Sequence, residues 1–404
     1  MAKKKSAALG FIFVTLLIDV IGIGIIIPIV PVLIQELTGE GLSQASVYGG
    51  WLLFAYAFMQ FVFAPILGGL SDQYGRRPIL LAALFGFAVD YSIAALAPTL
   101  SWLFIARVLA GITGASFTTA SAYIADISTP EKRSQNFGII GAAFGLGFIV
   151  GPVIGGILGQ YGSRVPFIAA AVLSILNWLY GYFILPESLP QEKRRKFDIK
   201  RANPLGSFMR LMKFPAIFSL AIAMFFLYVA GQVNPAIWSY FTMLKFNFDE
   251  AWVGYSLGFV GLMVAIVQGG LIRMVIPLLG DWKALVIGFL FNIVGFVAFA
   301  YSTQVWMLFA FIVPFSLGGF AGPALQGIIS KQVSDNEQGE LQGSLTSLMS
   351  ISSIIGPPIF TGLFHFYTET PQERYFPGSP FLLAAIICVV AALLALRSYR
   401  KHHQ

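Results

Sequence analysis

Long apolar runs with almost no charge are the feature that most constrains how this chain can fold. Each run extends over about 20 residues, the length that a helix needs to cross the hydrocarbon core of a bilayer. Of the 404 residues, 57% are hydrophobic and only 11% are charged, whereas soluble domains are roughly one quarter charged. Membrane β-strands would be about ten residues long and would alternate in polarity. The runs therefore predict an all-α integral membrane protein.

Hydropathy divides the chain into twelve predicted transmembrane helices. Because twelve is an even number, both termini are expected on the same side of the membrane. The single cysteine, Cys388, lies in the last run, which excludes a disulfide within the chain and a cysteine metal site. The predicted spans are 9–34, 48–70, 78–97, 101–123, 137–158, 165–185, 215–240, 252–275, 283–302, 305–329, 341–364 and 380–397.

The distribution of basic residues sets the predicted orientation. Most of the 25 Lys and Arg residues fall on the side of the termini, and only Arg164, Lys245 and Arg374 fall on the opposite side. Basic residues concentrate in cytoplasmic loops. Both termini are therefore expected in the cytoplasm. The net charge of +7 is then a signal of topology, and no nucleic-acid partner is predicted.

A long polar segment divides the chain into two halves of six spans. Residues 187–214 form a predicted cytoplasmic linker between an N-terminal bundle, 1–186, and a C-terminal bundle, 215–404. Two six-span repeats are the plan of major-facilitator transporters, with the substrate site between them near the midplane. The repeat is inferred from glycines that match between the halves, and a chance match of glycines is the alternative explanation. At an offset of 205 residues, the matching positions are Gly114 and Gly319, Gly138 and Gly343, and Gly151-Pro152 and Gly356-Pro357.

The loop between the second and third spans, with glycines, Asp72 and two arginines in register, resembles the cytoplasmic signature of the major facilitator superfamily. In GGLSDQYGRRP, residues 68–78, glycines permit a tight turn and arginines can pair with carboxylates of neighbouring helices. We expect a latch that holds one conformation; a plain basic turn is the alternative. The residues in the register of the signature are Gly68, Asp72, Gly75, Arg76 and Arg77.

This latch needs an acidic partner at the same end of the bundle. Asp126, in AYIADISTPEKR at the end of the fourth span, is the partner that we predict, although Glu131 is also available. Asp126 can instead cap the next helix. Position 73 is usually basic in the superfamily and is Gln73 here, which predicts a thinner network.

The fifth span, GIIGAAFGLGFIVGPVIGG at residues 138–156, is rich in glycine. Glycines give a helix a smooth face that packs closely against a partner, and a proline bends the helix. The spacing is the pattern associated with drug/proton antiporters, and generic helix contact is the alternative. The matching residues are Gly138, Gly147, Gly151, Pro152, Gly155 and Gly156.

Three ionisable residues, Asp19, Asp90 and Arg107, lie inside the predicted spans, all near mid-depth. A charge at the bilayer centre costs at least about 2.5 kcal/mol, so such residues are expected to face one another and a wet cavity. Two acids and one base leave one acid without a counter-ion, and burial then favours its protonated form. This predicts a proton site; a purely structural triad is the alternative.

Together these segments resemble the tetracycline resistance group of drug/proton antiporters. The resemblance is densest around Asp19-Val-Ile-Gly22-x-Gly24, VDYSIAALAP, RVLAGITGAS, AYIADIS and the fifth-span pattern, and continues weakly through GQVNPAIW, PALQGIIS and EQGELQGSL. It implies a role for Asp19 in substrate and proton handling, for Asp90 in the substrate pathway, and for Arg107 as an essential charge on the fourth span.

The second half departs from that group at two positions. Where tetracycline exporters carry a His on the eighth span and an Asp on the ninth, this chain has Val264 and Asn292, although Gln268 matches. Neither replacement titrates near pH 7. Proton transfer is therefore expected to depend on Asp19 and Asp90, and the identity of the cargo stays open.

A second set of polar and aromatic residues is predicted to line a substrate cavity together with Asp19 and Asp90. Such a lining suits an amphipathic organic ligand, and packing within the bundle is the alternative for each residue. The residues are Gln232, Asn234, Trp238, Gln268, Asn292 and Gln326.

Other classes of function lack the residues that they need. The three histidines, His365, His402 and His403, lie in or near loops and the tail and form no predicted metal or catalytic cluster, so we expect neither an enzyme nor a cofactor. We expect a monomeric transporter of a small molecule and protons in a bacterial inner membrane. It would export its cargo by proton antiport, and a proton-coupled importer is the alternative.

Overall fold

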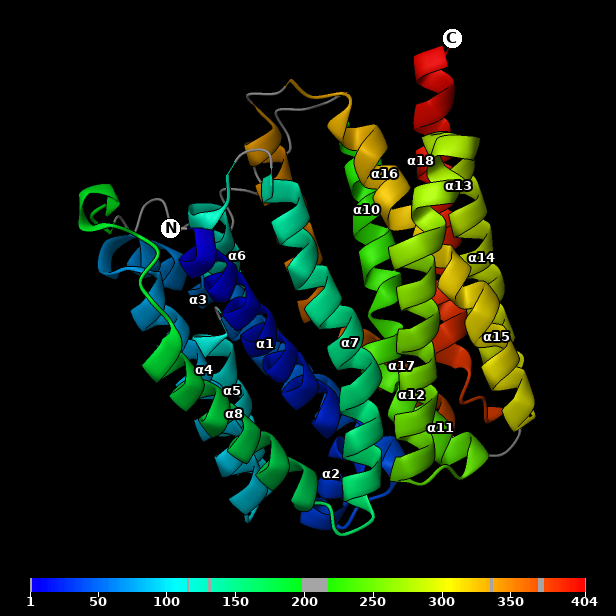
Figure 1. Ribbon diagram of the computed structural model, residues 1–404. Coiled ribbons are helices and arrows are strands. Elements are labelled where there is room, and N and C mark those ends of the chain that lie inside the picture. Colours follow the sequence, from blue (N-terminus) through cyan, green and yellow to red (C-terminus); the bar gives the residue numbers. More distant parts are fainter. Residues whose placement is uncertain are drawn as a thin grey trace. The chain divides into compact units, whose positions relative to one another are not determined.

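The computed structural model describes residues 2–114, 116–129, 132–197, 217–334, 337–369 and 374–403. These residues form helices, with no strand among them (Figure 1). The first half contains α1 (Ala2–Ile26), α2 (Val30–Thr38), α3 (Leu42–Tyr74), α4 (Arg76–Leu96), α5 (Leu100–Thr113), α6 (Ser116–Ile127), α7 (Arg133–Gly159), α8 (Val165–Ile184) and a 3-10 turn (Gln191–Lys193).

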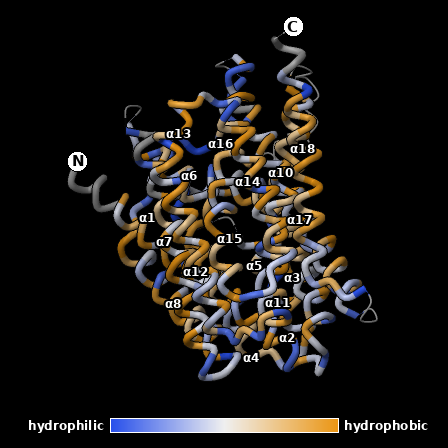
Figure 2. Tube along the Cα trace, turned by 90° about the vertical axis from the view of Figure 1, so that its right-hand side faces the viewer, coloured by the Kyte–Doolittle hydropathy of each residue, from blue (hydrophilic) through white to orange (hydrophobic). Residues whose placement is uncertain are grey.

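The second half contains α10 (Phe218–Gly231), α11 (Val233–Phe246), α12 (Glu250–Ile266), a π-helical turn (Val267–Leu271), α13 (Ile272–Leu279), α14 (Asp281–Tyr301), α15 (Val305–Leu317), a 3-10 turn (Gly318–Phe320), α16 (Ala321–Ser330), α17 (Gln338–Thr368) and α18 (Ser379–His403). Within the described residues, twelve helical segments are long and apolar enough to cross a membrane. The twelve-span, all-α prediction is confirmed. Figure 2 shows long hydrophobic stretches along these helices.

Several spans are interrupted, and local sequence explains where. The predicted span 9–34 divides at residues 27–29 into α1 and α2, because Pro28 and Pro31 cannot donate the backbone hydrogen bonds of a continuous helix. Helix α15 gives way to a 3-10 turn soon after Pro314. The seventh span divides at Gln232, which ends α10 and precedes α11.

The repeat predicted from glycines is also present in the helix boundaries. Arg76 begins α4 and Asp281 begins α14, and Leu100 and Val305 begin α5 and α15, in both cases 205 residues apart. The same spacing relates the starts of α6 and α16 and of α7 and α17. Two copies of one helical pattern therefore follow each other along the chain.

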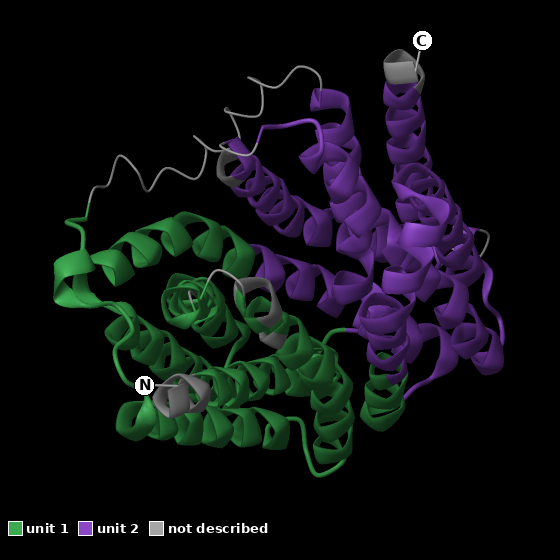
Figure 3. Cartoon of the chain, turned by 45° about the horizontal axis from the view of Figure 1, so that its top comes forward, with its two compact units in different colours: residues 1–40, 55–203, 249–258 green, residues 41–54, 204–248, 259–404 purple. Residues whose placement is uncertain are grey.

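Contacts divide the chain into two compact units (Figure 3). Unit 1 comprises residues 1–40, 55–203 and 249–258, and unit 2 comprises residues 41–54, 204–248 and 259–404. The start of α3 therefore groups with unit 2 and the start of α12 with unit 1. The division into bundles 1–186 and 215–404 stays a prediction, and much of the linker, residues 198–214, lies outside the described residues.

Candidate functional site

Two of the three predicted intramembrane charges form an ion pair inside unit 1. Arg107 of α5 donates through its guanidinium to Asp90 Oδ2 of α4. The Asp90 side chain is fully buried, and the Arg107 side chain is 19% exposed. The Tyr91 ring lies 6.0 Å from the guanidinium carbon and adds a cation–π contact. Asp90 and Arg107 thus neutralise each other, a pairing that the sequence left open.

The third charge, Asp19 of α1, is buried without a base. Its residue is only 4% exposed, and no ion pair joins it to a basic side chain in the described part of the chain. Instead, Asn177 Nδ2 of α8 donates to Asp19 Oδ1 over 3.2 Å. Asp19 is therefore the acid left over after pairing, and it carries the free carboxyl of the site.

Asn177 is a residue that the sequence reading missed. It is fully buried and also donates to the Thr15 carbonyl oxygen over 3.0 Å. The sequence does show that this residue needs hydrogen-bond partners, because Asn177 is a polar amide in the apolar run AAAVLSILNWLYGY of the sixth span.

The glycines of the fifth span give α1 and α7 a very close crossing. A Cβ added at Gly151 would lie 2.8 Å from Gly24 Cα, and one added at Gly147 would lie 2.6 Å from Val20 Cβ. Gly155 meets the backbone of Ile25 in the same way. Asp19 precedes this crossing directly on α1, so the glycine seam fixes the helix that carries the buried acid.

Two members of the glycine pattern have other surroundings. A Cβ added at Gly156 would lie 3.0 Å from Ala251 Cα, and one at Gly254 would contact the Pro152 carbonyl oxygen, so the start of α12 packs on another face of α7. At Gly138, nothing in the described structure outside its own helix lies within 4 Å of an added Cβ. Gly138 takes no part in the seam.

The predicted cytoplasmic latch forms a connected network. Arg76 bonds to Asp72 Oδ1 at 2.5 Å and to Asp126 Oδ2 at 3.1 Å. Ser188 donates to the same Asp126 oxygen over 3.0 Å. Arg77 points elsewhere and donates to the Tyr182 carbonyl oxygen over 2.6 Å. The structure thus brings Asp72, Arg76 and Asp126 together; Glu131 lies outside the described residues.

Glu187, just after α8, completes this network and was not predicted. Its carboxylate accepts the backbone N–H groups of Arg76 at 2.8 Å and Arg77 at 3.2 Å, at the N-terminus of α4. Gly75 has φ +103°, and a Cβ there would clash with the Glu187 carboxyl carbon. By contrast, nothing described lies within 4 Å of a Cβ added at Gly68.

The residues predicted for the second half of the cavity are mostly bonded or packed within unit 2. Trp238 is 2% exposed and packs edge-on against Phe299, with ring centroids 5.1 Å apart. Asn292 donates to the Gly318 carbonyl oxygen over 3.0 Å and so fastens α14 to the turn after α15. Neither arrangement resembles an open cavity wall.

The remaining four cavity candidates are more accessible. Gln232 donates to Ser353 Oγ over 3.1 Å, and Gln326 donates to Gln342 Oε1 over 2.8 Å. Gln268 is exposed on the π-helical turn. Asn234 is half-buried, and no partner of its Oδ1 is found among the described residues. Of these four residues, Gln268 and Gln326 are exposed, whereas Gln232 and Asn234 are half-buried.

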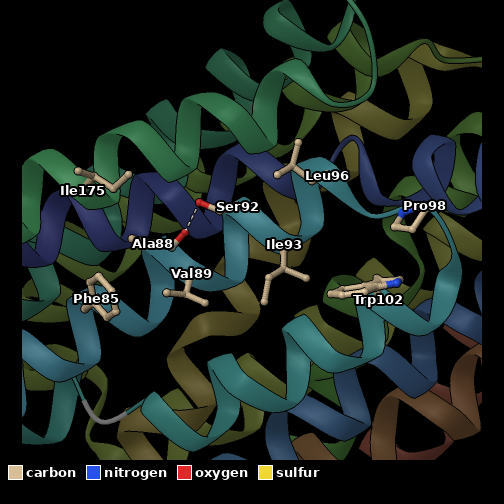
Figure 4. A pocket seen from close by; sticks show the side chains of 9 residues that line it. All are labelled: Phe85, Ala88, Val89, Ser92, Ile93, Leu96, Pro98, Trp102 and Ile175. Carbon is tan, nitrogen blue, oxygen red and sulfur yellow. Dashed lines mark hydrogen bonds between the residues drawn. The ribbon is translucent and has the colours of Figure 1, made fainter.

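A pocket of about 450 Å³ lies against α4, α5 and α8 (Figure 4). Ser92 supplies a hydroxyl there, but it donates to the Ala88 carbonyl oxygen over 2.7 Å. Phe85, Trp102 and Ile175 are exposed hydrophobic residues. The pocket contains none of the predicted site residues and is suited to contact with lipid. Its lining residues are Phe85, Ala88, Val89, Ser92, Ile93, Leu96, Pro98, Trp102 and Ile175.

Comparisons with known proteins agree with this architecture. The family model described as "Major Facilitator Superfamily" matches residues 12–301 and 278–404. A "Tetracycline resistance protein, class C" of Escherichia coli is 41% identical over 89% of this chain and 90% of the relative. A class G protein of Vibrio anguillarum is 40% identical over 89% of this chain and 91% of the relative.

Solved structures show the same fold at lower sequence identity. A human organic anion transporter superimposes with a TM-score of 0.73 at 22% identity, covering 96% of this chain and 99% of that chain. A variant of the nucleoside transporter NupG superimposes with a TM-score of 0.81 at 14% identity, covering 97% of this chain and 100% of that chain.

Proposed function

Because this chain belongs to the major facilitator superfamily, and within it to the group of tetracycline resistance proteins, we propose that it is a proton-coupled exporter that exchanges inward-moving protons for an outward-moving amphipathic drug. Relatives with 34–41% identity bear the name tetracycline resistance, which supports a tetracycline as the first cargo to test. The importer alternative has less support.

The observation that carries the mechanism is the unequal environment of the two acids. Asp90 faces Arg107, so its charge is compensated. Asp19 has an amide neighbour and no base, so a proton on Asp19 changes the net charge of the site. An intramembrane carboxyl of this kind is a functional group by default. Asp19 takes up a proton from the outer side and releases it inward, and cargo occupies the carrier in the deprotonated part of the cycle.

Two further parts of the site serve alternating access in this proposal. The latch of Asp72, Arg76 and Asp126, with Gly68, Gly75 and Arg77 in the same loop, stabilises one conformation at the cytoplasmic end. The glycine seam between α1 and α7 holds these two helices in close contact, so they move together. The residues assigned to the cargo are Gln232, Asn234, Trp238, Gln268, Asn292 and Gln326.

The proposed setting is the cytoplasmic membrane of a bacterium, with both termini in the cytoplasm. The support is the positive-inside distribution of Lys and Arg. The chain acts as a monomer of two six-helix bundles, 1–186 and 215–404, and needs no cofactor and no nucleic acid. Protons and one small organic molecule are its partners besides lipid.

Inverted membrane vesicles test the proposal and its direction. The lumen is acidified, tetracycline or another amphipathic drug is added outside, and luminal pH is followed with a fluorescent dye. Antiport predicts luminal alkalinisation on drug addition, and Asp19→Asn should remove it. Acidification on drug addition would indicate symport, and no pH change with a broad drug panel would contradict proton-coupled export.

A further inference from the structure

Asn177 reaches from α8 to two atoms of α1 that lie one helical turn apart. Its Nδ2 atom donates to the Thr15 carbonyl oxygen at 3.0 Å and to Asp19 Oδ1 at 3.2 Å. A backbone carbonyl can only accept, so the amide nitrogen must face it. The orientation of the amide is therefore determined, and both hydrogens of Nδ2 are used.

This orientation makes the two oxygens of Asp19 unequal. Oδ1 accepts a hydrogen from Asn177 Nδ2, and in a protonated carboxyl the carbonyl oxygen is a better acceptor than the hydroxyl oxygen, so this hydrogen bond favours Oδ1 as the carbonyl oxygen. The other oxygen, Oδ2, is buried and has no partner among the described residues. When Asp19 is protonated, the hydrogen therefore belongs on Oδ2.

Hydroxyl groups lie around the same position on α1 and α6. Thr15 Oγ1, Ser116 Oγ and Thr119 Oγ1 are buried, and none has a hydrogen-bond partner in the described structure. The Ser116 hydroxyl lies close to the Asp19 carboxyl, though outside hydrogen-bonding geometry. Buried polar groups that the fold leaves unpaired are normally satisfied by ordered water.

The helices bring these hydroxyls to neighbouring levels. Thr15 precedes Asp19 by about 6 Å along α1, and Thr119 follows Ser116 by about 4.5 Å along α6. In the predicted topology these helices cross the membrane in opposite directions, so Thr15 and Thr119 both lie on the cytoplasmic side of the carboxyl. Side chains of the same two helices belong to one buried hydrophobic cluster, which includes Phe11, Ile12, Leu16, Ala120, Tyr123 and Ile124.

We propose that Asn177 is a positioning residue for proton coupling, which holds Asp19 Oδ1 so that Oδ2, the oxygen left without a partner among the described residues, is the atom that takes up and releases the proton. This inference rests on the proposed proton-coupled function and identifies the oxygen of Asp19 that carries the proton. Because Asn177 has no charge in either state of Asp19, it orients the carboxyl without competing for the proton.

Several titratable groups lie near Asp19, but Asn177 is the side chain that donates a hydrogen bond to its carboxylate. The phenols of Tyr56 and Tyr91 lie near it, together with the paired Asp90 and Arg107. The described parts of α7 and α8 present no acid or basic residue at this level, and Asp126 of α6 lies at the cytoplasmic end in the latch.

Two variants separate positioning from mere packing. In purified protein reconstituted into proteoliposomes, drug-dependent proton flux is measured as a function of pH, and labelled drug counterflow is measured without a proton gradient. Asn177→Leu keeps the size of the side chain but cannot donate, and proton flux should fall about tenfold while counterflow stays within about twofold. Ser174→Ala, a buried polar position on the same helix, is the control and should leave both rates unchanged.

If the Asn177→Leu variant does not fold, Asn177→Asp provides a second test. A second carboxyl beside Asp19 disfavours ionisation of the pair, so the midpoint of the pH profile should move to higher pH by about one unit. An unchanged profile in both variants, or an equal loss of flux and counterflow in well-folded Asn177→Leu, would overturn the positioning role. Absence of drug-dependent proton flux in the unmodified protein would instead overturn the proposed function.

Discussion

Arg76 and Asp281 occupy the same position in the two halves of the repeat and carry opposite charges. Each residue begins a helix, α4 or α14, directly after a glycine with positive φ, Gly75 or Gly280. Arg76 pairs with Asp126, and Asp281 pairs with Lys331. The partners are also 205 residues apart, so the ion pair has been kept in both halves while its charges have been exchanged.

The two pairs should differ in importance, because they differ in burial. The Arg76 side chain is 11% exposed and bonds to two carboxylates, whereas the Lys331 side chain is 73% exposed. Exposed ion pairs contribute little, about 0–1 kcal/mol. Arg76→Ala should therefore lower the transport rate about tenfold or more, and Lys331→Ala should change it by less than about twofold. Equal losses in a vesicle transport assay would contradict the difference.

Glu187 should stabilise the start of α4. Its carboxylate accepts two backbone N–H groups that the helix itself cannot satisfy. Loss of such a cap costs about 1 kcal/mol, so Glu187→Ala should lower the melting temperature of the detergent-solubilised protein by about 2 °C. Glu192→Ala, an exposed acid in the same segment, is the control. A melting temperature unchanged by Glu187→Ala would exclude the capping role.

The glycine seam predicts a contrast within a single motif. Gly151→Ala places a methyl group 2.8 Å from Gly24 Cα and from the Ile21 carbonyl oxygen, and overpacking of this kind costs about 1–3 kcal/mol. Folded yield and transport should fall clearly. Gly138→Ala meets nothing described within 4 Å and should behave like the unmodified protein. Equal tolerance of both substitutions would show that the close crossing is unimportant.

The sequence predicted the helices well because hydropathy and helix length are properties of each segment alone. The twelve spans could be inferred in this way. The repeat offset came from matching glycines, and the pairing of Arg76 with Asp126 came from the loop signature and its need for an acidic partner. Asn177 and Glu187 were missed because their roles depend on partners more than 100 residues away. No local pattern distinguishes a lone Asn that bonds to Asp19 from one that packs passively.

Trp238 shows the opposite difficulty. The sequence predicted that Trp238 lines the cavity, with packing as the alternative, and its ring packs against Phe299 and Phe381. Which face of α11 is covered depends on α14 and α18, and these follow much later in the chain. The sequence therefore predicts where a transmembrane helix lies, but the tertiary structure is needed to tell which face of that helix is covered.

Because Asp90 and Arg107 form a buried ion pair, we expect that replacing one of them destabilises the protein more than replacing both. Removing a single partner leaves an uncompensated buried charge, which typically costs about 3–5 kcal/mol, whereas removing both avoids that penalty. Arg107→Gln alone should therefore reduce the folded yield in the membrane more than Asp90→Asn combined with Arg107→Gln. Yield is measured by fluorescence-detected size exclusion of a tagged protein. If the loss of yield in the double variant equals the sum of the losses in the two single variants, the charges of Asp90 and Arg107 do not depend on each other.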